Sequence, residues 1–209
     1  MIIKGLAKIA IKRKVLWLKI VIHLSALLPL INLYYQAIFD QLGADPVQEV
    51  IHFTGISAFN LLLITLMVSP LAKYFKAGYL LQVRRLLGLY AFCYAFFHVL
   101  NFLAFDLQFA WSLFISEVFE RPYISIGMIS FLFLTALAVT SHNLIRRKML
   151  KTWQTLHNYN YLIVLLVGVH FYWSVKSALI SPLFYLFLTI VILLLRHKKI
   201  KGLFKRFRS

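Results

Sequence analysis

The sequence predicts an all-α membrane protein: a bundle of six transmembrane helices with both termini in the cytoplasm. Of its 209 residues, 62% are hydrophobic, too many for a water-soluble domain that keeps a polar surface. Six apolar runs approach the ~20 residues that a helix needs to cross a bilayer. These runs are 15–39, 54–72, 85–106, 122–141, 157–175 and 178–195. They leave only short tails and loops, so we expect a single transmembrane domain over residues 1–209.

Local signals refine several of these spans. The first run has a basic leader but no small-residue cleavage site, so we expect it to stay as a signal anchor. Gly43-Ala44-Asp45-Pro46 is typical of a turn that closes the first outer loop, and we place His52 in that loop, capping the second helix. Pro122 opens the fourth span near its first turn, where proline is favoured.

The charges predict the orientation. Of the 23 basic residues, 21 fall in the tails and loops of one side, whereas all six acidic residues fall on the other side, with only Arg121 and Lys176. By the positive-inside rule the basic side is cytoplasmic, so we expect both termini of this multi-pass protein in the cytoplasm. Because the basic residues flank helices rather than cover a folded face, nucleic acid is not an expected partner. The basic set includes Lys198, Lys199, Lys205, Arg206 and Arg208 after the last span.

Three histidines lie deep in the predicted spans: His23, His98 and His170. A strongly hydrogen-bonding ring at membrane depth is costly, so each is a candidate functional residue. His98 and His170 lie about thirteen residues into the third and fifth spans, which run the same way, so their rings can face each other. Two neutral imidazoles are what a bis-histidine heme requires. The alternative is that each histidine bonds a hydroxyl or carbonyl of a neighbouring helix, and His23 is either such a contact or a cofactor or quinone contact.

His157 is a third candidate ligand, at the start of the fifth span and thirteen residues before His170. On a regular helix this spacing rotates the second side chain by about 220°, so the two rings share a face only if the helix bends, which Gly168 would permit. Arg84 and Arg85 lie at the level of His157 on the third span. They are candidates to clamp heme propionates or to anchor the helix at the interface.

Several short stretches from the first outer loop to the fifth helix form a specific set. They are GADPV (43–47), HFTG (52–55), RRLLGL (84–89), RPY (121–123), WQTLHN (153–158) and HFYWSVK (170–176). In this order they resemble the MsrQ family, also called YedZ. That family is the heme-binding membrane subunit of the bacterial methionine sulfoxide reductase system MsrPQ, within the ferric-reductase-like transmembrane group.

The resemblance implies one or two molecules of heme b, with His98, His157 and His170 as iron ligands, and a flavin mononucleotide (FMN) to which no residues can be assigned. It implies the electron-transfer subunit of an oxidoreductase system, without a substrate-reducing site of its own. Electrons would come from the quinone pool or a cytoplasmic flavin reductase. They would pass to a periplasmic molybdenum-containing subunit that repairs oxidised methionine. Larger members of the group carry a second histidine where this chain has Arg84.

The residues themselves exclude several other functions. No glycine-rich nucleotide fingerprint follows a strand, and no HExxH run or catalytic triad is recognisable, so dehydrogenase and hydrolase chemistry lack support. The rival function is a small transporter or proton carrier that uses the buried histidines as a relay. Against it, the spans have neither paired carboxylates nor half-way glycine and proline breaks. We also recognise no internal repeat in the sequence.

Overall fold

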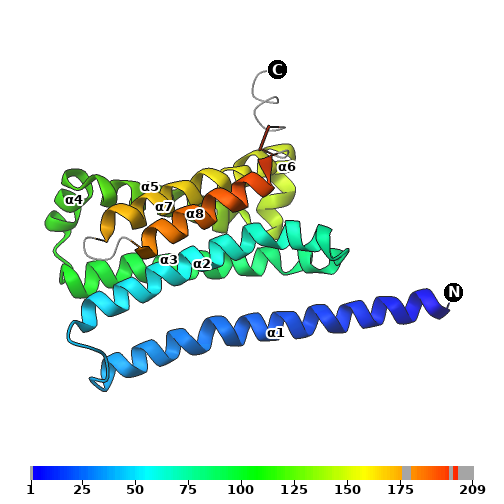
Figure 1. The fold of residues 1–209 in the computed structure, drawn as a ribbon, viewed down its shortest axis with the longest axis horizontal. Coiled ribbons are helices and arrows are strands. Elements are labelled where there is room, and N and C mark those ends of the chain that lie inside the picture. The colour runs from blue at the N-terminus through cyan, green and yellow to red at the C-terminus, as the bar shows by residue number, and fades with distance from the viewer. Residues whose placement is uncertain (1, 176–179, 198–199, 202–209) are drawn as a thin grey trace. The chain divides into compact units, whose positions relative to one another are not determined.

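The computed structural model describes residues 2–175, 180–197 and 200–201, which are helical with short connections and contain no strand. The chain divides into two compact units, residues 1–102 and 103–209, which are described separately (Figure 1). The elements are α1 (Ile2–Ile38), α2 (Pro46–Tyr74), the 3-10 helix η1 (Gly78–Gln82), α3 (Arg84–Asn101), the π-helix η2 (Phe102–Asp106), α4 (Trp111–Glu120), α5 (Pro122–Thr140), α6 (Asn143–Asn158), α7 (Asn160–Ser174) and α8 (Ile180–Leu195).

In the first unit α2 and α3 form an antiparallel pair joined through η1 (Figure 1). Phe59, Leu62 and Leu66 of α2 and Ala91 of α3 are almost completely buried. Lipid tails are as apolar as leucine, so dense side-chain packing rather than a hydrophobic driving force holds such a pair together within a bilayer. The pair is the closely packed part of this unit.

The second helix begins earlier than the sequence analysis predicted. It starts at Pro46, and the Asp45 carboxylate accepts a hydrogen bond of 3.0 Å from the amide of Gln48, as an N-cap residue does. The placement of His52 in the outer loop was therefore wrong, because His52 lies in the second turn of α2. The Asp45-Pro46 pair therefore marks the start of α2 as well as the end of the first loop.

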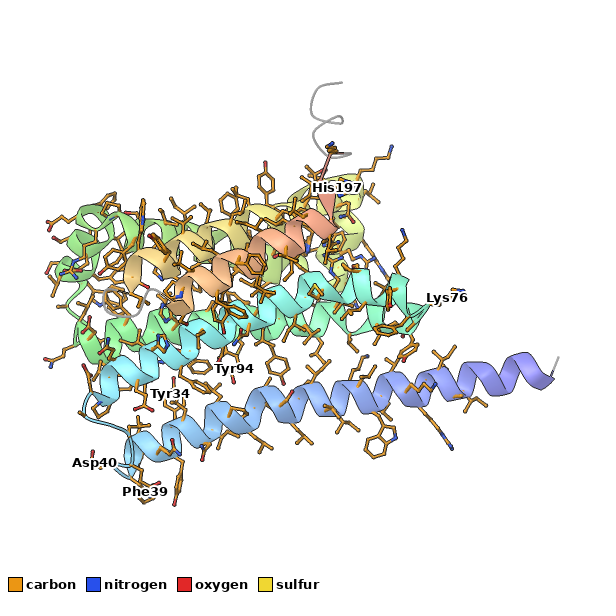
Figure 2. The ribbon with its side chains drawn as sticks, in the orientation of Figure 1. Tyr34, Phe39, Asp40, Lys76, Tyr94 and His197 are labelled. Atoms are coloured by element: carbon orange, nitrogen blue, oxygen red, sulfur yellow. The ribbon has the colours of Figure 1, made fainter. Side chains whose placement is uncertain are left out.

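Hydrogen bonds made by Tyr94 and Tyr34 help to attach α1 to α3 within the first unit. The hydroxyl of Tyr94 donates to the backbone oxygen of Ala26 at 2.7 Å, and the hydroxyl of Tyr34 donates to Oδ1 of Asn101 at 2.8 Å. Figure 2 shows the Tyr34 and Tyr94 side chains between the ribbon of α1 and the α2–α3 pair. Most of the remaining α1 surface exposes large apolar side chains, as expected of a helix that faces lipid.

In the second unit α5 packs on α7 and α7 packs on α8. Pro122 occupies the first turn of α5, which confirms the prediction from the Arg121-Pro122 pair. Ile163 and Val164 of α7 and Thr189 of α8 are fully buried. These three helices form the packed part of the unit (Figure 1).

The helix that carries His170 is separate from the one that carries His157. α6 ends at Asn158 and α7 begins at Asn160, with Tyr159 between them. The predicted fifth span, 157–175, corresponds to α7 apart from its first residues, but the placement of His157 on the same helix as His170 was wrong, because His157 lies on α6.

Among the described residues, four helices are long and apolar enough to cross a membrane. They are Ile9–Ile38, Pro46–Tyr74, Arg84–Asp106 and Pro122–Thr140, which coincide with the first four predicted spans. α7 and α8 are apolar but have 15 and 16 residues, fewer than the ~20 of a usual span. Crossing by these two helices, the six-helix bundle and the cytoplasmic termini stay predictions. Lys176 and the tail residues Lys198, Lys199, Lys205, Arg206 and Arg208 lie outside the described residues.

Candidate functional site: two histidines held by backbone carbonyls

His98 lies near the end of α3, half-buried against the first turns of α2. Its Nδ1 is 2.9 Å from the backbone oxygen of Ile51. A β-carbon built on Gly55 would lie 2.9 Å from both Nδ1 and Cε1 of the ring, closer than real β-carbons approach other atoms. The ring therefore lies against the bare backbone of α2, in space that a side chain at position 55 would fill.

His170 has the same surroundings in the second unit. Its Nδ1 is 2.7 Å from the backbone oxygen of Tyr123, in the first turn of α5. A β-carbon on Gly127 would lie 2.9 Å from Nδ1 and from Cε1 of the His170 ring. The Tyr123 ring lies tilted beside the imidazole, with 6.3 Å between ring centroids.

These hydrogen bonds fix the tautomer of both rings. A carbonyl oxygen only accepts, so Nδ1 of His98 and of His170 carries the hydrogen and donates. In a neutral imidazole the lone pair is then on Nε2. Metal-binding histidines characteristically donate their other ring N–H to a carbonyl or carboxylate, which fixes the ring and raises its basicity. Both histidines thus have the donor chemistry of an axial heme ligand.

His157 is held differently. Its Nε2 is 3.2 Å from Oγ1 of Thr140, at the end of α5, and that hydroxyl donates its own hydrogen to the backbone oxygen of Ala136 at 2.6 Å. Nε2 of His157 is therefore the donor, and the lone pair of a neutral ring is on Nδ1. Trp153 stacks on the imidazole with 4.0 Å between centroids, and its indole N–H donates to the backbone oxygen of Thr140. These contacts are those of a helix-packing histidine, and a ligand role for His157 stays a prediction.

The two candidate arginines lie in the first turn of α3, Arg84 half-buried and Arg85 exposed. His98 follows Arg84 by 14 residues on the same helix, which is about 21 Å along the axis. The propionate role of both arginines stays a prediction. His23 of α1 bonds the Tyr90 hydroxyl of α3 through Nδ1 at 2.5 Å, which agrees with the interhelical alternative for that residue.

A polar chain runs behind His98 within the first unit. Thr54 is fully buried, and its hydroxyl lies 2.8 Å from the Val50 oxygen and 3.0 Å from the Ile51 oxygen that also accepts from His98. Nδ2 of Asn101 reaches the Thr54 hydroxyl at 3.5 Å, and Oδ1 of Asn101 accepts from Tyr34. The carbonyl that holds His98 therefore lies next to a set of polar groups from three helices: Thr54 of α2, Asn101 of α3 and Tyr34 of α1.

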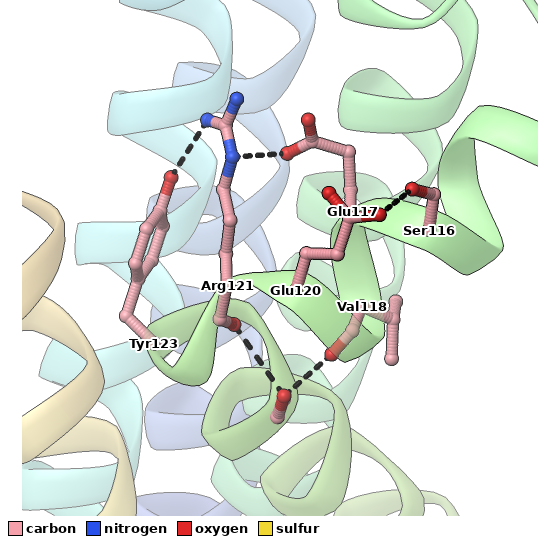
Figure 3. A network of polar contacts seen from close by, with 7 residues as sticks. Ser116, Glu117, Val118, Glu120, Arg121 and Tyr123 are labelled. Carbon is pink, nitrogen blue, oxygen red and sulfur yellow. Dashed lines mark hydrogen bonds and ion pairs between the residues drawn. The ribbon is translucent and has the colours of Figure 1, made fainter.

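A charged network lies beside the carbonyl that holds His170 (Figure 3). Nε of Arg121 lies 2.7 Å from the Glu117 carboxylate, and the guanidinium donates to the Tyr123 hydroxyl at 3.3 Å. The hydrogen bond to Tyr123 raises the pKa of Arg121 from its ordinary value. Tyr123 is thereby bound at both ends, through its side chain to Arg121 and through its backbone to His170.

The donor set fits a heme. Within the part of the chain that the structure describes, no three His, Cys, Asp or Glu side chains gather as a metal-ion site. A heme does not need such a cluster, because the porphyrin holds the iron and the protein supplies only axial ligands. Imidazoles with the lone pair on Nε2, each on a helix among apolar residues, meet that requirement at His98 and His170.

These features define a helical protein with helices of membrane-spanning length, in which two half-buried imidazoles are each held through Nδ1 by a backbone carbonyl. A family model described as ferric reductase like transmembrane component matches residues 54–168, more than half of the 209 residues. The chain belongs to this family, which indicates a membrane component of oxidoreductase electron transfer. The match includes His98 and His157 and ends two residues before His170.

Sequence reasoning found the histidines but missed what holds them. Ile51 and Tyr123 act through their backbone oxygens, so their side chains give no signal. One feature of the sequence could have indicated these contacts: Gly55 precedes His98 by the same number of residues as Gly127 precedes His170. That regularity is visible only once the pairs are known.

Proposed function

We propose that this chain is the heme-binding subunit of a membrane electron-transfer system, with His98 and His170 as iron ligands. The observation that carries the proposal is the shared geometry of the two rings, in which Nδ1 donates to a carbonyl near the start of an earlier helix, α2 for His98 and α5 for His170. This arrangement presents Nε2 as the ligating atom and holds the ring so that no rotamer search accompanies binding.

When bound, heme b supplies an iron that alternates between ferric and ferrous states and so carries one electron at a time. The chain's own residues orient the imidazoles and exclude water with apolar helices. The matched depth of His98 and His170 in the sequence is the basis for proposing that one iron takes both. His157, Arg84 and Arg85 are the proposed residues of a second heme or of propionate binding.

The finer assignment follows the resemblance to the MsrQ family. We propose a bacterial inner-membrane subunit that receives electrons from quinone or a cytoplasmic flavin reductase, with FMN as a further cofactor. The proposed acceptor is a periplasmic molybdenum-containing methionine sulfoxide reductase. Family membership supports the electron-transfer role, and the six quoted stretches support the particular system.

The test is a reduced-minus-oxidised spectrum of protein purified in detergent, with the heme content per chain. Wild-type protein should show b-type bands, and His98→Ala and His170→Ala should each lose the bis-histidine low-spin signature. His197→Ala is the control, because His197 is exposed and, in the described contacts, its ring bonds only the backbone oxygen of Leu194 at the end of α8. Wild-type bands in both His98→Ala and His170→Ala would remove the ligand assignment.

The same experiment separates one shared heme from two. If one iron takes both histidines, each single substitution converts all the heme to a changed spin state. If the histidines bind different hemes, each single substitution removes about half of the heme and leaves the rest with wild-type bands.

The carboxylates of the chain disfavour the rival proton carrier. Five of the six acidic residues are exposed, and Glu117, the half-buried one, is paired with Arg121. Buried acidic relays are the usual mark of such carriers. Proton or solute uptake by heme-free proteoliposomes is the result that would favour the rival.

A further inference from the structure

The two histidine sites are the same arrangement, built twice. In each, the accepting carbonyl comes 47 residues before the histidine, and a glycine follows that carbonyl by four residues on the same helix. The three residues of the first site (Ile51, Gly55, His98) and of the second (Tyr123, Gly127, His170) differ by a constant 72 positions. This constant spacing indicates that the same arrangement of carbonyl, glycine and histidine occurs in both units.

The side chains around the two carbonyl–glycine pairs do not resemble each other. The first site reads Ile51-His52-Phe53-Thr54-Gly55 and the second reads Tyr123-Ile124-Ser125-Ile126-Gly127, so glycine is the only shared residue of the two helix segments. The element common to both sites is therefore backbone: a carbonyl that accepts from Nδ1 and a residue without a side chain.

The nearest contacts at each glycine are made by the imidazole. At Gly55 the three atoms nearest to an added β-carbon are Cε1, Nδ1 and Cγ of His98, at 2.9, 2.9 and 3.6 Å. At Gly127 they are the same three atoms of His170, at 2.9, 2.9 and 3.4 Å. Gly88 of α3 is different, because its nearest neighbour is a methyl group of Thr65 at 4.0 Å. The space above Gly55 and Gly127 thus belongs to the histidine rings.

We infer that Gly55 and Gly127 are positioning residues for the two iron ligands. The missing side chain lets each imidazole lie against the helix so that Nδ1 reaches the carbonyl one turn earlier, and this contact sets the ring plane and the tautomer. Any larger residue must displace the ring and break the hydrogen bond of 2.9 or 2.7 Å. The inference rests on the proposed heme function, but the geometry it uses is that of the chain alone.

The test compares Gly55→Ala and Gly127→Ala with Gly88→Ala, a matched control on the helix of His98. Gly88→Ala has room for its methyl group and should keep wild-type heme content and spectrum. The other two should bind heme about 10- to 100-fold more weakly, the usual effect of losing a contact that orients a metal ligand. Their remaining heme should show an altered low-spin signal, and added imidazole should restore it by replacing the displaced ring.

A heme-independent measurement covers variants that fold poorly. If the added methyl group clashes with the ring, Gly55→Ala/His98→Ala should be as stable as His98→Ala, and Gly127→Ala/His170→Ala as stable as His170→Ala. A double variant clearly less stable than the corresponding histidine variant alone would overturn the inference, because the added methyl group would then be costly without the ring; wild-type heme affinity and spectrum in both single glycine variants would overturn it as well. Wild-type protein without heme, or His98→Ala and His170→Ala with unchanged bands, would instead overturn the proposed function and this inference with it.

Discussion

Removing the hydrogen bond between Tyr34 and Asn101 tests quantitatively how strongly α1 is attached to α3. Asn101 is 2% exposed, and its Oδ1 accepts from the Tyr34 hydroxyl at 2.8 Å. Its amide also reaches Thr54, but the 3.5 Å separation is beyond the usual hydrogen-bond range. Asn101→Leu keeps the side-chain volume while removing both contacts.

The expected loss follows from the surroundings of the pair. Hydrogen bonds between membrane helices contribute about 0.6 to 1.7 kcal/mol each, since the separated helices also find partners. We count one full bond to Tyr34 and a weak one to Thr54, so Asn101→Leu should lower the free energy of unfolding by ~1 to 2 kcal/mol. Tyr34→Phe removes only the first bond and should cost ~1 kcal/mol.

The assay is a double-mutant cycle measured by reversible unfolding in mixed detergent micelles. Tyr34→Phe and Asn101→Leu should be non-additive, with a coupling energy of ~1 kcal/mol, because they remove the same bond. Tyr35→Phe is the control, since the Tyr35 side chain is 51% exposed and should lose little. A coupling energy below ~0.3 kcal/mol, or an equal loss in Tyr35→Phe, would refute the reasoning.

Three other substitutions test separate parts of the structure. Asp45→Ala removes the N-cap of α2 and should cost ~1 kcal/mol of stability, while Asp45→Asn should keep most of it; equal losses in thermal unfolding would contradict the capping role. Thr140→Val removes the acceptor of His157 and should destabilise the protein by ~1 kcal/mol; unchanged heme content in the absorbance spectrum would count against the second-heme role proposed for His157, and heme loss would support it. Arg121→Gln breaks the ion pair with Glu117, which is partly open to solvent. It should change the unfolding midpoint little, and any difference from wild type should shrink with added salt; a salt-independent loss would show that the pair is effectively buried.

The sequence was sufficient for the elements whose cause is local. Long apolar runs predict helices for a membrane, because no other local structure satisfies the backbone in lipid. Four of the predicted spans coincide with helices of spanning length. Pro122 marked the start of α5 correctly, and Asp45-Pro46 held the start of α2, although the pair was interpreted as a turn. Histidines at membrane depth were recognisable as candidates because their cost there does not depend on the fold.

The tertiary structure decided what each histidine does. Three imidazoles look alike in sequence, yet His98 and His170 donate from Nδ1 to a carbonyl, whereas His157 donates from Nε2 to a hydroxyl. Which ring nitrogen keeps the lone pair depends on an acceptor from a helix distant in the chain. Two of those acceptors are backbone oxygens, which every residue possesses, so the residue types at those positions do not identify the acceptors. The glycines that admit the rings also become meaningful only when the helices are packed, because only packing shows which side chain occupies the space that they leave.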